Sequence, residues 1–223
     1  MQPYTTIAGT PKPILRGYSH AIAAVGAVAG VPWLLRAADG DPSRQAALLV
    51  YGLSAVLLFA CSGLYHTLPW PPRYRALLRR LDHAMIFVMI AGSYTPIAYT
   101  MLTGWWRIGL LAGVWAVALA GVTAVTMPHP VSRRVRVGLY LALAWLAVLV
   151  SATILIPLGF HDLRLPLAGG ALFMAGALAY ACRRPVLWPR VFGYHEFFHL
   201  AVISGNVAFF LFMITYVAPL APH

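Results

Sequence analysis

The stretch Ala46–Leu68, with the sequence AALLVYGLSAVLLFACSGLYHTL, decides the fold of this chain. It contains no Asp, Glu, Lys or Arg, and about 20 apolar residues are enough for a helix to cross the hydrocarbon core of a membrane. The rest of the chain has the same character, because 61% of its 223 residues are hydrophobic and only 9% are charged. An average soluble domain has about 25% charged residues. The sequence therefore predicts an integral, multi-pass protein of the cell (inner) membrane.

Seven apolar segments of this kind follow one another along the chain. They are continuously apolar, whereas the strands of a membrane β-barrel alternate apolar and polar side chains, so we expect helices. Residues 1–13 lack the basic start and cleavage site of a signal peptide, and we expect the N-terminus to be retained. The prediction is an all-α, seven-transmembrane helix bundle that forms a single domain over residues 1–223. The expected spans are Tyr18–Leu35, Ala46–Leu68, Asp82–Leu102, Ile108–Met127, Val137–Leu158, Leu165–Cys182 and Phe197–Val217.

The basic residues are divided unequally between alternate loops. Only four of the sixteen lie in the first, third and fifth loops: Arg36, Arg44, Arg107 and Arg164. The other twelve lie in the N-terminal segment and in the second, fourth and sixth loops: Lys12, Arg16, Arg73, Arg75, Arg79, Arg80, Arg133, Arg134, Arg136, Arg183, Arg184 and Arg190. By the positive-inside rule, the N-terminus is then cytoplasmic and, after seven spans, the C-terminus is extracytoplasmic. Membrane topology thus explains the net charge of +11 better than a nucleic acid partner does.

Five polar residues fall at the cytoplasmic ends of three expected spans. Ser62 and His66 are four residues apart, as are His195 and His199, so each pair shares one helix face. Asp82 begins the third span. Ionisable groups inside a membrane are costly and usually functional. Three imidazoles leave a fourth position for water, which favours zinc, although imidazole also suits copper, iron and nickel.

Each of these residues also has a purely structural interpretation. The histidine pair could be two solvated side chains at the membrane interface. Asp82 could cap the third helix, and Ser62 could donate to a backbone carbonyl one turn earlier. His83 lies on a different helix face from Asp82, so we expect it to have a packing role. We expect the same for His20, which could also pair with a carboxylate.

The segment His195–His199 reads HEFFH, which matches the H-E-x-x-H signature of zinc metalloproteases. In that alternative, Glu196 is the catalytic base. The sequence around Asp82, Leu81-Asp82-His83, does not match the motif that supplies the further aspartate of intramembrane metalloproteases. On the three-histidine interpretation, Glu196→Gln should leave zinc binding nearly normal.

These motifs resemble the signature of the hemolysin III family, which is related to the progestin and adiponectin receptors and, more distantly, to the alkaline ceramidases. The residues concerned are Ser62-x-x-x-His66, Asp82-His83 and His195-x-x-x-His199, together with Lys12–His20 and Ser93–Pro96. The resemblance implies zinc held by the residues His66, His195 and His199. It also implies that Asp82 and Ser62 lie near the zinc-bound water.

The resemblance leads us to expect a zinc-dependent hydrolase of lipid amide or ester bonds at the cytoplasmic leaflet. Asp82 would orient the water and accept its proton, and Ser62 would bond that water or stabilise the oxyanion. The expected partner is a membrane lipid, such as a ceramide-like amide or a free fatty acid. A non-enzymatic lipid sensor with a structural zinc ion is the main alternative. A cytolytic pore is less favoured, because no polar face repeats along several helices.

Overall fold

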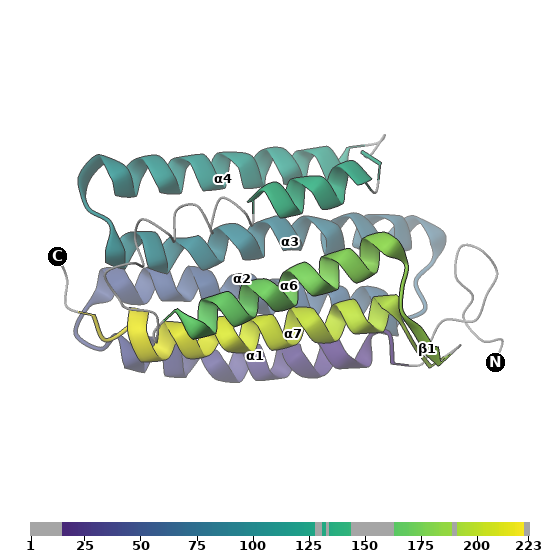
Figure 1. Cartoon of the computed structure of the whole chain (residues 1–223), viewed down its shortest axis with the longest axis horizontal. Helices are drawn as coiled ribbons and strands as arrows, with labels where there is room; N and C mark the ends of the chain where they lie inside the picture. The colour runs from purple at the N-terminus through teal and green to yellow at the C-terminus, as the bar shows by residue number, and fades with distance from the viewer. Residues whose placement is uncertain (1–14, 128–130, 133, 144–162, 189–190, 221–223) are drawn as a thin grey trace.

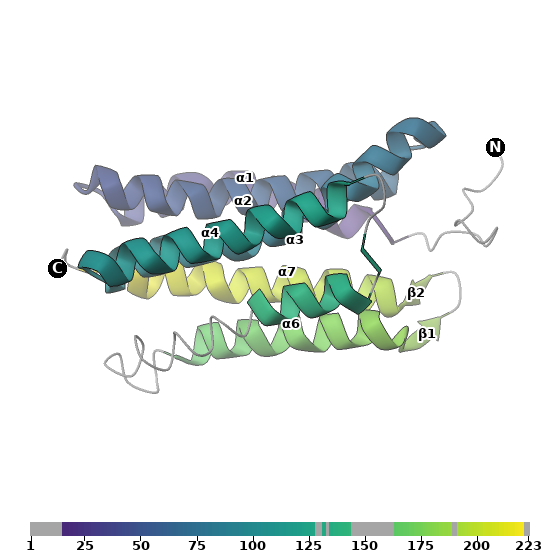
Figure 2. The same cartoon turned by 90° about the horizontal axis from the view of Figure 1, so that it is seen from above.

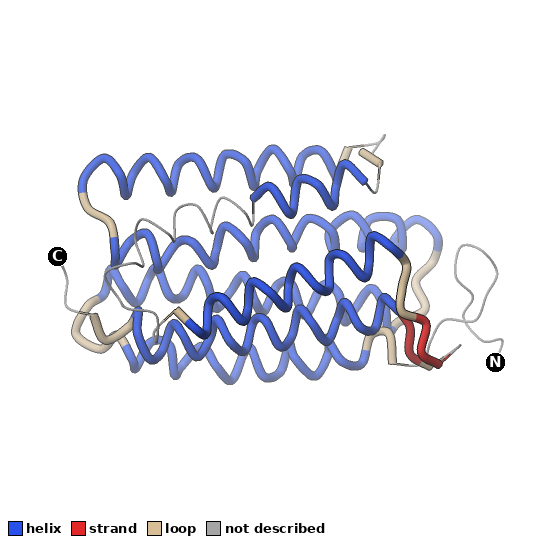
Figure 3. The backbone as a smooth tube through the Cα atoms, in the orientation of Figure 1, coloured by secondary structure: helices blue, strands red, loops and turns tan. Residues whose placement is uncertain are grey.

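The computed structural model describes residues 15–127, 131–132, 134–143, 163–188 and 191–220, and these form an all-α bundle (Figure 1). Long helices make up almost all of it, with two short strands at one end (Figure 3). In the described part, six helices are long and apolar enough to cross a membrane. The elements are α1 (Tyr18–Ala37), α2 (Pro42–Thr67), α3 (Pro72–Met101), α4 (Gly104–Thr126), α6 (Arg164–Cys182), β1 (Val186–Trp188), β2 (Phe192–Gly193), α7 (Tyr194–Phe212) and the π-helical turn η2 (Met213–Val217).

The expected span Val137–Leu158 lies mostly outside the described residues. Its first part is described, because residues 134–143 form a helix. The third helix differs from the prediction, because α3 begins at Pro72 and not at Asp82. Hydropathy detects only the apolar part of a helix. The α3 helix begins earlier, with a proline in its first turn, in a segment rich in arginine. Asp82 therefore lies well inside α3, and the interpretation of Asp82 as a helix cap is wrong.

Contacts between helix ends define one end of the bundle. A Cβ atom on Gly17, just before α1, would lie 2.8 Å from the backbone carbon of His66 in the last turn of α2. His66 in turn faces His195 in the first turn of α7. The Arg80 side chain of α3 donates to the carbonyl of Thr126 at the end of α4. We call this region the histidine end.

The opposite end joins the start of α2 to the end of η2, where the Arg44 guanidinium donates to the Ala218 carbonyl over 2.7 Å. The start of α1 and the end of η2 therefore lie at opposite ends of the bundle (Figure 1). The described basic residues separate in the same way. Arg36, Arg44, Arg107 and Arg164 lie at this opposite end, and the histidine end has Arg16, Arg73, Arg75, Arg79, Arg80, Arg134, Arg136, Arg183 and Arg184.

Small residues let the helices that form the site pack closely. A Cβ on Gly63 of α2 would lie 3.0 Å from the backbone of Ala21 in α1. Likewise, a Cβ on Gly176 of α6 would lie 2.9 Å from the side chain of Ala201 in α7. Helices in membranes associate mainly through such close packing. Figure 2 shows α6 beside α7, with the β1–β2 hairpin, paired at Val186 and Gly193, leading directly into α7.

Candidate metal centre

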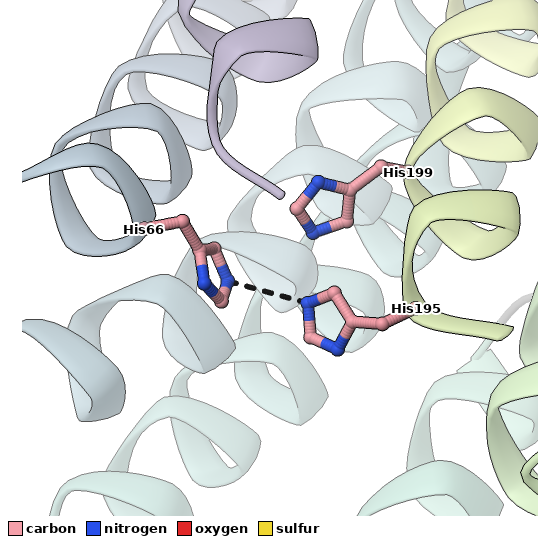
Figure 4. Close-up of side chains that lie close together, drawn as sticks. All are labelled: His66, His195 and His199. Atoms are coloured by element: carbon pink, nitrogen blue, oxygen red, sulfur yellow. Dashed lines mark hydrogen bonds between the residues drawn. The ribbon is translucent and has the colours of Figure 1, made fainter. Parts of the chain in front are cut away.

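Three imidazoles converge at the histidine end of the bundle. His66 comes from the last turn of α2, and His195 and His199 come from consecutive turns of α7 (Figure 4). One ring nitrogen from each lies within 4.8 Å of the other two. The rings turn toward one another, with centroids 4.6 to 5.1 Å apart. The structure thus brings together three predicted site residues from two helices.

The arrangement fits a metal ion. Two nitrogen ligands about 2.05 Å from an ion at a tetrahedral angle lie about 3.3 Å apart. The Nε2 atoms of His66 and His195 are 3.3 Å apart. Only 5% of the His66 side chain is exposed, and His199 is buried. A set of three imidazole nitrogens suits zinc, and it equally suits copper, iron or nickel.

Asp82 and Ser62 lie next to this cluster. The Oδ2 atom of Asp82 is 3.8 Å from Nε2 of His66, the nitrogen that also faces His195. Asp82 is 15% exposed, and Ser62 is buried within hydrogen-bonding reach of its carboxyl group. Ser62 therefore has a polar partner in α3, which a role limited to its own helix would not require. If the cluster holds a metal ion, the carboxylate of Asp82 lies beside that ion.

The other two histidines considered from sequence lie outside the converging set. His83 bonds through Nδ1 to the carbonyl of Arg79, and its own carbonyl accepts from Tyr140. It therefore has the expected packing role. His20 is buried and stacks on His199 with ring centroids 3.8 Å apart. The suggestion that His20 pairs with a carboxylate is wrong, because its ring contacts are aromatic and its Nε2 lies 3.4 Å from the carbonyl oxygen of His199.

Glu196 has a role that its place in the HEFFH segment did not indicate. Its Oε1 accepts from Nε of Arg16 over 2.7 Å, and its Oε2 accepts from the backbone of Gly193 over 2.9 Å. Both oxygens are therefore engaged away from the three imidazoles. This geometry argues against Glu196 as a catalytic base. Sequence reasoning missed Arg16 as its partner, because 180 positions separate the two residues. The only signal was the motif Lys12–His20.

Comparison with known proteins gives one consistent answer. A model of haemolysin-III-related proteins matches residues 9–210. The chain is 31% identical to "Hemolysin-3" of Bacillus cereus over 204 residues, which cover 88% of this chain and 89% of that protein. It is 29% identical to a "Hemolysin-3 homolog" of Bacillus subtilis (strain 168), with 75% of each chain covered. It is 30% identical to the "Heptahelical transmembrane protein ADIPOR2" of Oryza sativa subsp. japonica, covering 73% of this chain and 78% of that protein.

The range matched by the family model, residues 9–210, includes the three converging histidines and Asp82. Six long apolar helices in the described residues agree with the name of the Oryza relative, which is called a transmembrane protein. An inner-membrane location is consistent with the bacterial relatives. The chain thus belongs to the haemolysin III family of integral, multi-pass membrane proteins, which is related to the progestin and adiponectin receptors.

Proposed function

We propose that this chain is a zinc-dependent hydrolase that cleaves an amide or ester bond of a membrane lipid. The observation that supports the proposal is the position of Asp82, whose Oδ2 lies 3.8 Å from the Nε2 of His66 that also faces His195. Three protein ligands leave one position of a tetrahedral zinc ion open for water or substrate. A carboxylate beside that position can act as a general base.

The proposal gives each side chain a separate task. His66, His195 and His199 would hold the ion through neutral ring nitrogens. A bound zinc ion would activate water near neutral pH and polarise a carbonyl group. Asp82 would orient the attacking water and accept its proton. Ser62, within hydrogen-bonding reach of the Asp82 carboxyl group, would hold that carboxylate in position.

An apolar cavity, whose lining includes Ile203 one helical turn after His199, supports a lipid substrate. It measures about 540 Å³ and lies between α1, α2 and α7, with Gly30, Ala55, Phe59 and Phe210 in its wall. Cavities of about 300 to 1,000 Å³ are typical of small-molecule sites. The Phe59 ring contacts the His20 ring at 5.1 Å between centroids, and His20 stacks on His199. An acyl chain in this cavity would lie near the cluster, with the rings of Phe59 and His20 between it and His199.

Topology would place this chemistry at the cytoplasmic leaflet. We propose seven spans. Six are the described helices, and the remaining one, the fifth in chain order, is the expected span Val137–Leu158 between α4 and α6. The histidine end contains nine described basic residues and the opposite end four. The positive-inside rule then makes the histidine end cytoplasmic. A lipid carbonyl at headgroup depth would meet the proposed metal there.

A lipid sensor with a structural metal is the second candidate. It is favoured by the same short separation between Asp82 and His66, because Asp82 could supply a fourth protein ligand. Structural zinc sites usually have four protein ligands, whereas catalytic sites have three and a water. In that case zinc would join α2, α3 and α7, and lipid binding would change how these helices pack.

The variant Asp82→Asn separates the two candidates, because it keeps the size of the side chain and removes the base. The hydrolase proposal predicts that the purified variant keeps its zinc and loses fatty-acid release from lipid amides or esters by about 100-fold or more. Zinc content and fatty-acid release are measured on the same samples. Asp39→Asn, an exposed change at the opposite end, is the matched control and should behave as wild type. No release by the wild type across a broad lipid panel, with zinc lost from Asp82→Asn, would reject the hydrolase in favour of the sensor.

A further inference from the structure

We propose that Arg16, His20 and Glu196 are positioning residues that form a clamp across α1, α2 and α7 and thereby set the metal affinity of the three imidazoles. The proposal rests on the metal site proposed above. It assigns Glu196 a task other than general base, and it gives the Lys12–His20 motif a function that the three ligands do not explain.

The ion pair between Arg16 and Glu196 is the first part of this clamp. It measures 2.7 Å, with 17% of the Arg16 side chain and 2% of the Glu196 side chain exposed. Glu196 lies between the two histidines of α7, and its second oxygen caps the start of that helix at Gly193. Removing one partner of a buried ion pair leaves the other charge uncompensated. The backbone that carries His195 therefore depends on a residue that precedes α1.

His20 is the second part of the clamp. It is four residues after Arg16, and its ring lies between two helices. On one side it stacks on His199 of α7, with centroids 3.8 Å apart and planes 10° apart. On another side it meets the edge of Phe59 of α2 at 5.1 Å. One face of the His199 ring is thus stacked against His20, and this contact restricts how the ring can rotate.

These contacts act on the separation between α2 and α7, the two helices that supply the imidazoles. The distances from a metal ion to its ligands lie within about 0.2 Å of their ideal values, so a small shift of either helix weakens metal binding. Residues that orient metal ligands from outside typically contribute 10- to 100-fold in metal affinity. The ion pair also changes the expectation for Glu196→Gln. This variant loses the negative charge beside Arg16, and zinc binding should weaken without any loss of a base.

Zinc affinity of the purified full chain in detergent, measured by competition with a chromogenic chelator, tests the clamp. Arg16→Ala and Glu196→Ala should each weaken binding by about 10- to 100-fold. The double variant should be no weaker than the worse single variant, because both changes remove one interaction. Arg16→Lys should recover part of the affinity, since its ammonium group keeps the charge. Arg44→Ala is the control: it removes an arginine contact at the opposite end that is more deeply buried than that of Arg16, and it should bind zinc as the wild type does.

The possible results are distinct. If the wild type binds no zinc, the proposed metal site fails and the clamp fails with it. If the wild type binds zinc and the Arg16 and Glu196 variants bind equally tightly, the clamp alone is overturned. Where the alanine variants do not fold, Arg16→Gln and Glu196→Gln are compared by the visible absorption spectrum of bound Co²⁺. A changed spectrum with weaker binding supports the clamp, and a spectrum and affinity equal to wild type refute it.

Discussion

Gly17→Ala should disrupt the metal site without touching any ligand side chain. The φ angle of Gly17 is −148°, outside the left-handed region that favours glycine, so the argument for a glycine here is one of space. A Cβ at this position would lie 2.6 Å from Cγ2 of Thr67 and 2.8 Å from the backbone carbon of His66. His66 is the residue that supplies the α2 imidazole.

The size of the effect follows from these distances. Carbon atoms pack favourably at about 3.5 to 4.0 Å, so the new methyl group requires a displacement of about 0.7 Å or more from the His66 backbone. That displacement is several times the tolerance of about 0.2 Å on metal–ligand distances. Extra volume in a packed region usually costs about 1 to 3 kcal/mol of folding stability. We expect zinc affinity to fall by about 10-fold or more, the size of effect found when the surroundings of metal ligands change.

The assay is zinc competition on purified protein, with thermal unfolding followed in parallel by circular dichroism. Gly26→Ala is the matched control, because a Cβ there meets nothing within 4 Å and the residue lies in α1, the helix that Gly17 precedes. That control should keep wild-type zinc affinity. Wild-type zinc affinity in Gly17→Ala would refute the reasoning that α1 fixes the position of His66.

Two further predictions concern the proposed ligands and the topology. Protein purified without added metal should contain one zinc ion per chain, and elemental analysis should find most of it lost in His66→Ala, His195→Ala and His199→Ala, because two imidazoles hold zinc weakly; full retention in all three variants would reject the site. A reporter fused after His223 should be extracytoplasmic and one in the loop before Arg79 cytoplasmic, since basic residues divide twelve to four between the two sides; a cytoplasmic C-terminus would contradict the odd number of spans.

The all-α membrane bundle could be predicted from the sequence because continuous apolar runs leave few alternatives in lipid. Helix boundaries outside the hydrocarbon could not be obtained in the same way. The α3 helix continues for nearly three turns before Asp82 through a segment that contains Arg73, Arg75, Arg79 and Arg80. Hydropathy excludes such a segment, although its backbone is helical. The error was important for function, because it made Asp82 look like a residue at a helix end.

The convergence of His66, His195 and His199 could also be anticipated, because spacing of four residues sets a helix face and loop charge sets a membrane side. The partners of these residues could not be anticipated. Arg16 and Glu196 are 180 positions apart, and no local pattern encodes their contact. The HEFFH spelling suggested a catalytic base at Glu196, and the pairing of its carboxylate with Arg16 argues against that role. Only the packing of α1 against α7 reveals that its carboxylate is already paired.

The burial of the cluster provides a final argument for a metal ion as its natural partner. Charging several imidazoles within 4.8 Å of one another would create strong repulsion in a region of low dielectric constant. Neutral imidazoles avoid that cost, and over the 3.3 Å between the Nε2 atoms of His66 and His195 one ring donates to the nitrogen lone pair of the other. A cation shared by these nitrogens would satisfy the lone pairs at once, and the negative charge of Asp82 would lower the cost of burying that cation. Glu196 differs from Asp82, because its carboxylate is already paired with Arg16 over 2.7 Å. In the proposed site, Arg16 therefore neutralises the carboxylate of Glu196, and the carboxylate of Asp82 is the one that interacts with the metal ion.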